Sequence, residues 1–399
     1  MISFAMLFSG ARPACTRAET GSGYVTHAEF SAKRRVAEQL QISLPLSHVY
    51  EALASAFDFN SYAALCAEHV FDIKRRSDFD LSVATASIAR RMDELGVTDS
   101  PGLRVSSELA KIALDEGLDV VSIDSVIDWL LADLYERDEK PFSDKELDDD
   151  VDDALDDDGS NESSMSKFFL SSLENAAKRG NPKAHYALSL RQQSDTEDEP
   201  SGWHWYERQL QGEQLSGVAL HWADSYRAAK EKEEDRVRHL REAARLRHPD
   251  ACVDAAEEFQ DPDFLKQVTG GDLRDPARAS EIAYELGAFD LARQWCKIAA
   301  EAGDVDSIRW MIEEFDQDNL ALCWKWVYFA QLLGTDLTED DYRAVNDDGS
   351  DYDDEVGGPC YPEGTEGIEL PPLDDSLDAI AHREAEALAA ALQITAGSQ

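Results

Sequence analysis

The stretch LARQWCKIAAEAGD, residues 291–304, decides the fold class of this chain. Trp295 precedes a pair of alanines, Ala299 and Ala300, by four and five residues, and Gly303 follows them. Residues at this spacing share one face of a helix, so the face carries one large ring and two small side chains. Small residues let a second helix approach closely, and glycine often ends a helix. The stretch therefore predicts the second helix of a hairpin that packs against the next hairpin.

The same arrangement recurs along residues 166–334, which is typical of a repeat protein. The paired positions are spaced by 33, 34, 56 and 31 residues, and they are Ala176-Ala177, Gln209-Leu210, Ala243-Ala244, Ala299-Ala300 and Ala330-Gln331. The long spacing predicts one unit plus an insertion within residues 261–276. A large side chain stands four residues before a pair at Trp205, His239, Trp295 and Trp326, and a small residue follows the turn at Ala184, Ser216, Ala251 and Ser307. Because one hairpin cannot cover its own apolar face, we expect about four hairpins to stack as a short α-solenoid.

The stretch WCKIAAEAGD, residues 295–304, resembles the Sel-one-like repeat, a short relative of the tetratricopeptide repeat. The consensus of that family ends in W-Y-x-x-A-A-x-x-G-D, and Cys296 replaces its tyrosine here. A second copy, residues 203–213, keeps Trp205 and Tyr206 but lacks the alanines. The resemblance covers about 170 residues. It implies a helical superhelix in a bacterial protein that gathers other proteins as an adaptor.

Residues 27–137 form a predicted N-terminal helical region, which follows a loose leader at residues 1–26. In LPLSHVYEALASAFDF, residues 44–59, a helix is predicted to start after Pro45, and residues 122–137 predict a very apolar helix. Together with AKRR (32–35) and NSYAAL (60–65), residues 44–59 resemble a small module found at the N-terminus of various bacterial proteins. Some of those proteins are described as glyoxalase-related, but the module itself carries no such chemistry.

The formal charge of −44 indicates which partners the surface favours. Residues 1–76 hold eight Lys/Arg and seven Asp/Glu, a net of +1, so the rest of the chain carries −45. Such a surface repels nucleic acid and anionic membranes and attracts basic molecules. We therefore expect another protein as partner, favoured to be basic, and no direct contact with nucleic acid or membrane. The basic clusters, Arg34-Arg35 and residues 74–76, are expected to contact acidic segments of the same chain.

Two acidic segments flank the repeats. Between residues 144 and 158 there are ten acidic residues and one lysine, which predicts a disordered linker at 138–165 and the main domain boundary. Residues 335–399 are expected to form an acidic loop and a capping helix, with Ile368 and Leu370 docking on the last repeat. The two possible EF-hand loops in these acidic runs have alanine at the first ligand position, so we predict no calcium site.

The remaining residue types favour a reduced, non-catalytic protein. The six cysteines are at least 27 residues apart and include no CxxC pair, which favours free thiols and a cytoplasmic location. The N-terminal apolar run is short and has no basic residue ahead of it, so we do not expect export. No H-E-x-x-H, G-x-S-x-G, G-x-G-x-x-G or Walker pattern occurs. The sequence thus predicts neither a catalytic site nor a metal or cofactor.

Candidate partner-binding residues come from an unusually dense aromatic group: Trp203, Trp205, Tyr206, Trp222 and Tyr226. One interpretation places all five in the repeat core. The other has Trp203 and Trp222 face a groove as anchors for a bound peptide, and we add His221, Arg309 and Trp310 as further candidates. The predicted function is a protein–protein interaction scaffold. Two alternatives stay open: an acidic nucleic-acid mimic that regulates a DNA-binding protein, and an enzyme or toxin-system component acting through the N-terminal module.

Overall fold

The computed structural model describes residues 44–73, 79–97, 100–138, 167–193, 202–268, 273–346 and 359–396. This part of the chain is mostly helical, as predicted, and it also contains two small two-stranded sheets that the sequence analysis did not predict. Its residues belong to two compact units: Met1–Val121 with Asp150–Leu173, and Ser122–Asp149 with Glu174–Gln399. The predicted leader, both basic clusters and nearly all of the predicted linker lie outside the described residues.

The described part of the first unit combines helices that pack on one another with a two-stranded sheet. Its elements are α2 (Leu46–Ala56), α3 (Tyr62–Glu68), β1 (His69–Ile73), α4 (Leu81–Glu94), α5 (Ser100–Asp115) and β2 (Leu118–Ser122). As predicted, α2 starts directly after Pro45, whose fixed φ suits a helix start. The side chains of Ser61 and Asp80 accept backbone N–H bonds and begin α3 and α4. The core is aromatic and aliphatic, with Tyr62 stacked on Phe71 and Ile88 fully buried.

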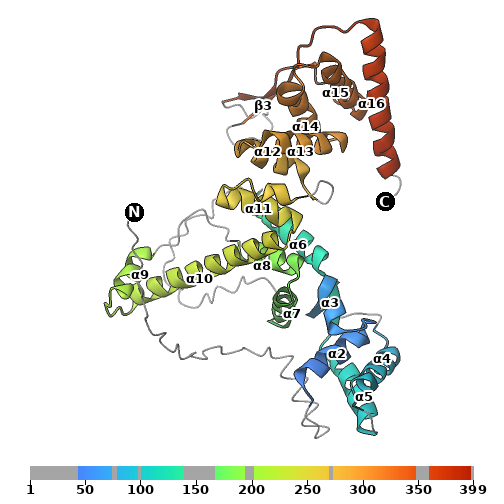
Figure 1. Cartoon of the computed structure of the whole chain (residues 1–399). Helices are drawn as coiled ribbons and strands as arrows, with labels where there is room; N and C mark the ends of the chain where they lie inside the picture. Colours follow the sequence, from blue (N-terminus) through green and yellow to red (C-terminus); the bar gives the residue numbers. More distant parts are fainter. Residues whose placement is uncertain are drawn as a thin grey trace, which may run out of the picture. The chain divides into compact units, whose positions relative to one another are not determined.

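The second unit is a succession of helices joined mostly by short turns (Figure 1). Its elements are α6 (Ile123–Asp138), α7 (Lys167–Lys178), α8 (Pro182–Gln192), α9 (Trp203–Leu210), α10 (Val218–Arg245), α11 (Pro249–Phe259), η1 (Leu265–Gln267), α12 (Pro276–Glu285), α13 (Phe289–Glu301), α14 (Val305–Trp310), the π-helix η2 (Met311–Phe315), α15 (Leu320–Leu333), β3 (Asp341–Val345), β4 (Tyr361–Thr365) and α16 (Asp375–Ala396). Helix α7 begins before Glu174 and runs into this unit. Among its described residues, the expected insertion region, 261–276, holds the short η1 and ends at the first residue of α12.

Helix α6 belongs to the second unit, although the sequence analysis assigned residues 27–137 to one N-terminal region. The difference has a physical cause, because α6 packs against α8 and ion pairs join it to later helices. Its buried face consists of Ile123, Val126, Ile127 and Leu130.

Three helices of the second unit start with the same local chemistry. Asn181, His248 and Asp275 each cap a helix whose first residue is proline. A proline at this position gives up no hydrogen bond, since the first N–H groups of a helix have no partner within it. Gly180 precedes the first of these caps with φ 84°, whereas Arg247 precedes the second with φ 64°. Arg247 therefore holds a left-handed conformation that glycine adopts without strain.

The alanine pairs lie where close helix packing was expected. All six alanines at 176–177, 243–244 and 299–300 are buried, and so is Ala330. The large residues Trp295, Trp326 and His239 are buried as well. The prediction for the second pair was wrong: Leu210 is 70% exposed, and Ser216 is also exposed. The hairpin α9–α10 departs from the other hairpins because α9 has no buried residue.

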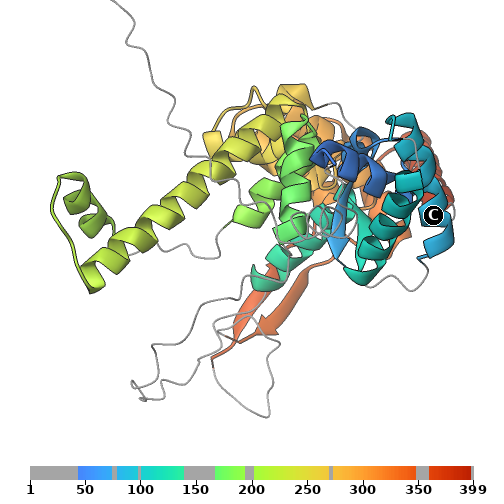
Figure 2. The ribbon, with the colours of Figure 1, turned by 90° about the horizontal axis from the view of Figure 1, so that it is seen from below.

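Helix α10 is the longest helix of the described chain, and only its C-terminal end is well buried (Figure 2). Its buried residues are Ala223 and then His239, Leu240, Ala243 and Ala244. Helix α9 folds back along the first turns of α10, as the views in Figures 1 and 2 show.

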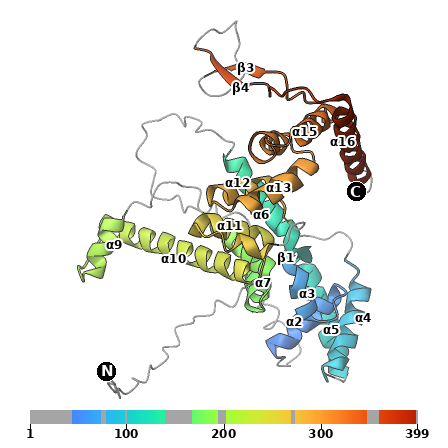
Figure 3. The same cartoon turned by 45° about the horizontal axis from the view of Figure 1, so that its top comes forward.

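Residues after α15 form an antiparallel hairpin and a long last helix (Figure 3). Strands β3 and β4 pair from Asp341 with Thr365 to Val345 with Tyr361, where the sequence analysis expected only an acidic loop. Helix α16 packs along α15, with the His382 ring stacked on Tyr328 at 3.6 Å between centroids. Ile368 and Leu370 pack against the core formed by α13, α14, η2, α15 and α16.

Candidate partner-binding surfaces

The aromatic group predicted from the sequence lies on the hairpin α9–α10. Trp203 is 51% exposed and Trp222 is 40% exposed, and His221 is exposed beside them in sequence. Trp205, Tyr206 and Tyr226 are half-buried, with the Tyr206 and Tyr226 rings 5.3 Å apart. The group therefore divides: Tyr206 and Tyr226 join the two helices, Trp205 is half-buried, and Trp203 and Trp222 face solvent.

A tight backbone contact sets the positions of the two exposed tryptophans. Gly202 has φ 125°, and a Cβ placed on it would lie 2.5 Å from the carbonyl oxygen of Trp222. Only glycine allows this close approach, so the start of α9 is held directly against the backbone of Trp222. At the other end of α9, Arg208 donates through Nε to Glu213 at 2.6 Å and lies over the ring of Trp205. The exposed rings thus belong to a hairpin whose two ends are fixed.

Arg309 and Trp310 lie elsewhere and already make contacts within the chain. The Arg309 guanidinium donates to the Glu313 carboxylate at 3.1 Å and to the Glu366 carbonyl at 3.0 Å. The half-buried Trp310 ring packs 5.3 Å from Tyr284 and 5.4 Å from Phe315. These two residues join α14 to its neighbours, whereas the rings of Trp203 and Trp222 are exposed to solvent.

The structure also contains a cavity of about 460 Å³ that the sequence analysis did not predict. Five helices of the second unit line it: α6, α8, α10, α11 and α12. Its apolar walls come from Leu131, Leu134, Tyr135, Leu190 and Leu240, and its polar groups are Tyr186, Ser189, Gln193, Arg236, Asp254, Glu257, Glu258 and Arg278. A cavity of this size with a few convergent polar groups is typical of a binding site.

Tyr186, Asp254 and Arg278 form the polar floor of the cavity. Arg278 donates to Asp254 at 2.7 Å and to Glu257 at 2.6 Å. Burial raises the pKa of the Asp254 carboxyl above its ordinary value, although Arg278 acts in the opposite direction. Burial also raises the pKa of Tyr186 well above 10, and the nearby Asp254 and Asp250 carboxylates add to that effect. Asp254 is thus a carboxylate in a site poor in water.

A second arginine, Arg236, lines the cavity from α10. It donates to Glu233 at 2.7 Å through both Nε and a terminal nitrogen, and to Glu258 at 2.8 Å. Hydrogen bonding to Glu233 raises the pKa of Arg236, with Glu258 adding to the effect against burial. Each arginine of the cavity is therefore held by two carboxylates.

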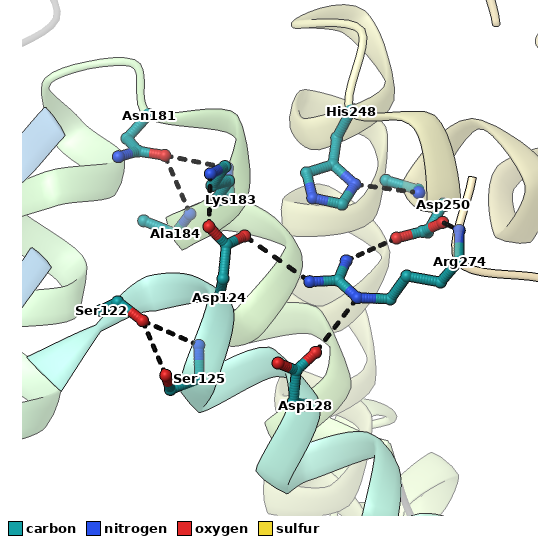
Figure 4. A network of polar contacts seen from close by, with 11 residues as sticks. Ser122, Asp124, Ser125, Asp128, Asn181, Lys183, Ala184, His248, Asp250 and Arg274 are labelled. Carbon is teal, nitrogen blue, oxygen red and sulfur yellow. Dashed lines mark hydrogen bonds and ion pairs between the residues drawn. The ribbon is translucent and has the colours of Figure 1, made fainter. Parts of the chain in front are cut away.

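A network of ion pairs, drawn in Figure 4, positions α6. This helix supplies Leu131 and Leu134 of the cavity wall. Arg274 is bonded to Asp250 at 2.6 Å and to Asp128 at 3.2 Å, and lies 3.5 Å from Asp124. Asp124 also accepts from Lys183 on α8 at 2.6 Å. Asp124 and Asp128 are one helical turn apart and share a face of α6. Arg274 pairs with both carboxylates and Lys183 with Asp124, so both cations bind that face. The network ties α6 to α8, to α11 and to the segment before α12.

Two buried histidines, His239 and His248, and the half-buried His185 lie near this network and the C-terminal end of α10. The Nδ1 atoms of His185 and His239 are 2.9 Å apart, so one ring donates and the other accepts. Burial lowers the pKa of His239 to about 4, and a charged Arg238 contributes. His248 accepts the Ala251 N–H at 3.4 Å through Nδ1, and burial lowers its pKa to about 4 as well. In each of these contacts the accepting Nδ1 atom must be unprotonated.

The remaining reactive groups of the described chain are buried or dispersed. Cys66, Cys252, Cys296 and Cys323 are buried thiols, and burial raises the pKa of Cys252 to about 11 and of Cys296 to about 12. In the part of the chain that the structure describes, no three His, Cys, Asp or Glu side chains are grouped to hold a metal ion. None of the described helices combines the length and apolarity that a bilayer crossing needs.

Comparisons with known proteins give no relative for this chain: no family model, no curated protein and no solved structure matches it.

Proposed function

We propose that this chain is a protein–protein interaction scaffold of the Sel-one-like kind, without chemistry of its own, in a bacterial cytoplasm. In this proposal the hairpins of the second unit stack as a short α-solenoid. The tail that contains Ile368 and Leu370, together with α16, covers its last repeat. The buried alanine pairs and the packing of Ile368 and Leu370 on the last core support this arrangement.

The exposed tryptophans of the hairpin α9–α10 carry the proposal. Ordering the backbone of a helix costs roughly 1–2 kcal/mol per residue, and α9 has eight residues but buries none of them. A partner that covers Trp203 and Trp222 would supply the missing burial. Aromatic side chains bury about 150–250 Å² each and are enriched at the centres of interfaces. The overall charge of −44 favours a basic partner.

The test compares three forms of the full-length chain in the cell that produces it. These are the wild type, the double variant Trp203→Ala/Trp222→Ala, and a matched control, Tyr342→Ala/Tyr361→Ala. The control removes two exposed aromatic rings, which are 51% and 47% exposed, from the hairpin β3–β4. We expect a protein that co-purifies with the wild type and the control to fall about tenfold or more with the tryptophan variant, as measured by quantitative mass spectrometry. Identical sets of co-purifying proteins for all three forms would contradict the proposal.

A further inference from the structure

The cavity between α6, α8, α10, α11 and α12 is a binding site of defined chemistry. We propose that it binds a protonated primary alkylamine, with the ammonium group among the carboxylates of α11 and the alkyl chain against the leucines. Two sources carry this chemistry, a lysine side chain of another protein and a free polyamine. The site is distinct from the exposed tryptophans of the hairpin α9–α10, and the inference does not depend on the scaffold function.

The charges that face the cavity favour a cation. Asp254, Glu257 and Glu258 line it against Arg236 and Arg278, so carboxylates outnumber guanidinium groups by three to two. Glu233 does not line the cavity but also pairs with Arg236, at 2.7 Å. An anion would have to compete with the carboxylates that already hold both arginines. The negative charge of the whole chain strengthens the preference, because a cleft with low-dielectric walls concentrates the field.

The acceptors that remain suit an ammonium group better than a guanidinium group. Arg278 occupies one oxygen each of Asp254 and Glu257, Tyr186 also bonds to Asp254, and Arg236 occupies one oxygen of Glu258, so the open acceptors are mainly those of Glu257 and Glu258. A planar guanidinium binds best to two parallel acceptors, and those on Asp254 and Glu257 are already used by Arg278. An ammonium group is a compact charge with three donors that can turn toward separate oxygens. Burial raises the pKa of Asp254, and a nearby cation would act in the opposite direction, as Arg278 already does.

The apolar wall fits the stem of such a ligand. Leu131 and Leu134 come from α6, Leu190 from α8 and Leu240 from α10, so leucines of three helices surround one opening. Lysine-like stems bury their methylenes on apolar surface while the charge reaches polar groups. Each methylene that leaves water is expected to raise the affinity about fourfold.

The experiment titrates the full-length chain with ethylamine, n-pentylamine, spermidine and Nα-acetyl-lysine-N-methylamide, using calorimetry at 0.15 M salt. Nα,ε-diacetyl-lysine-N-methylamide, which lacks the ammonium charge, is the neutral control. Glu257→Gln/Glu258→Gln removes two carboxylates that are 51% and 36% exposed, so folding should survive and is checked by circular dichroism. Glu242→Gln is the matched control, because Glu242 also pairs with an arginine on α10 but lies outside the cavity lining.

We expect saturable binding of n-pentylamine at one site, about tenfold or more tighter than ethylamine. The double glutamine variant should lose about tenfold in affinity, Glu242→Gln should behave as the wild type, and the diacetylated compound should not bind. Tighter binding of the lysine derivative than of spermidine assigns the site to a partner's lysine, and the reverse order assigns it to a polyamine. The inference is overturned if no amine saturates, if chain length has no effect, or if both glutamate variants behave alike.

Discussion

The hairpins α12–α13 and α9–α10 show two uses of the same kind of sequence. In α12–α13, Ala279, Ile282, Ala283, Ala292 and Trp295 all belong to one buried core. In α9–α10 the tryptophan-rich helix α9 has no buried residue, and Leu210 and Val218 are 70% and 72% exposed at its connection. A tryptophan at a repeat position is therefore a core residue only where a neighbouring helix covers it.

The cause of the difference lies in the paired positions. Ala299 and Ala300 leave room for the next helix, and both are buried. In α9 the equivalent positions are Gln209 and Leu210, whose longer side chains do not favour close helix packing, and Leu210 is not covered by another helix.

The largest contrast should come from tryptophan deletions in the two kinds of hairpin. Trp326 is 1% exposed and donates from Nε1 to the buried Asp316 at 2.9 Å. Trp326→Ala should lower the free energy of unfolding by about 3–5 kcal/mol, through lost burial and the loss of a hydrogen bond to one oxygen of Asp316, whose other oxygen still pairs with Arg293. Trp203→Ala should change it by no more than about 0.5 kcal/mol. Urea denaturation followed by far-ultraviolet circular dichroism measures both, and similar losses would show that α9 is part of a core.

Acid should lower the stability of the packing around His239, at the C-terminal end of α10, and around His248. The pKa values of His239 and His248 are about 4 in the folded chain, below the ordinary value of 6.5. The unfolded chain therefore binds more protons between pH 6.5 and 4, so stability is lost as the pH falls through that window. The loss approaches roughly 3 kcal/mol for each histidine, from about 1.4 kcal/mol per pKa unit.

The acid effect is measured as the free energy of unfolding between pH 7 and pH 4. His239→Gln should make the decline shallower in that window, since it removes one of the two groups. His221→Gln, at an exposed position on the same helix, serves as control and should leave the slope unchanged. Equal slopes for all three proteins would show that His239 does not contribute to the pH dependence of the free energy of unfolding.

Overpacking distinguishes the buried and exposed faces of the two hairpins. Ala299 is 2% exposed, so Ala299→Trp should cost about 1–3 kcal/mol or more. Ala228 is exposed on α10, and Ala228→Trp should stay within about 0.5 kcal/mol of the wild type. Thermal melts of the two variants give the comparison. An unchanged midpoint for Ala299→Trp would mean that the helix crossing at this pair is not close.

The smallest effect should be a gain in stability. Arg247 has φ 64° at the turn before α11, where the equivalent turn before α8 has Gly180 at φ 84°. Arg247→Gly should raise the free energy of unfolding by about 0.5–1 kcal/mol, because relief of strain exceeds the added entropy of glycine. Gly180→Ala should lower it by about 1 kcal/mol. If both changes had the same sign, backbone strain at these turns would not be the reason.

Sequence patterns were sufficient where a local rule decides the outcome. The helix start after Pro45 and the burial of Ala243-Ala244 and Ala299-Ala300 follow from capping and helix-face spacing. The exposure of Leu210 did not follow, since it depends on which other helices are near. Pairing of β3 with β4 joins residues that a turn-rich acidic composition does not connect.

The cavity was beyond sequence reasoning for a different reason. Its polar floor joins Tyr186, Asp254 and Arg278, which lie on three helices, and its leucine wall includes α6. The signal that could have found it is charge: Arg274 and Arg278 follow the four acidic residues of α11, and the sequence alone did not show which of them the two arginines pair with. Residues 122–137 were assigned to the N-terminal region, so the side chains of α6 that line the cavity were not expected beside α8 and α10.

Helix α10 also fixes a length. Trp222 near its start and Leu240 in the cavity are 18 residues apart, which corresponds to about 27 Å at 1.5 Å per residue. An extended peptide needs about eight residues to cover that span, at roughly 3.3–3.6 Å per residue. A ligand long enough to reach both places would gain avidity, because its second contact is intramolecular and has an effective concentration on the order of millimolar. A shorter ligand would be limited to one contact, so the helix would select partners by their length as well as by their chemistry.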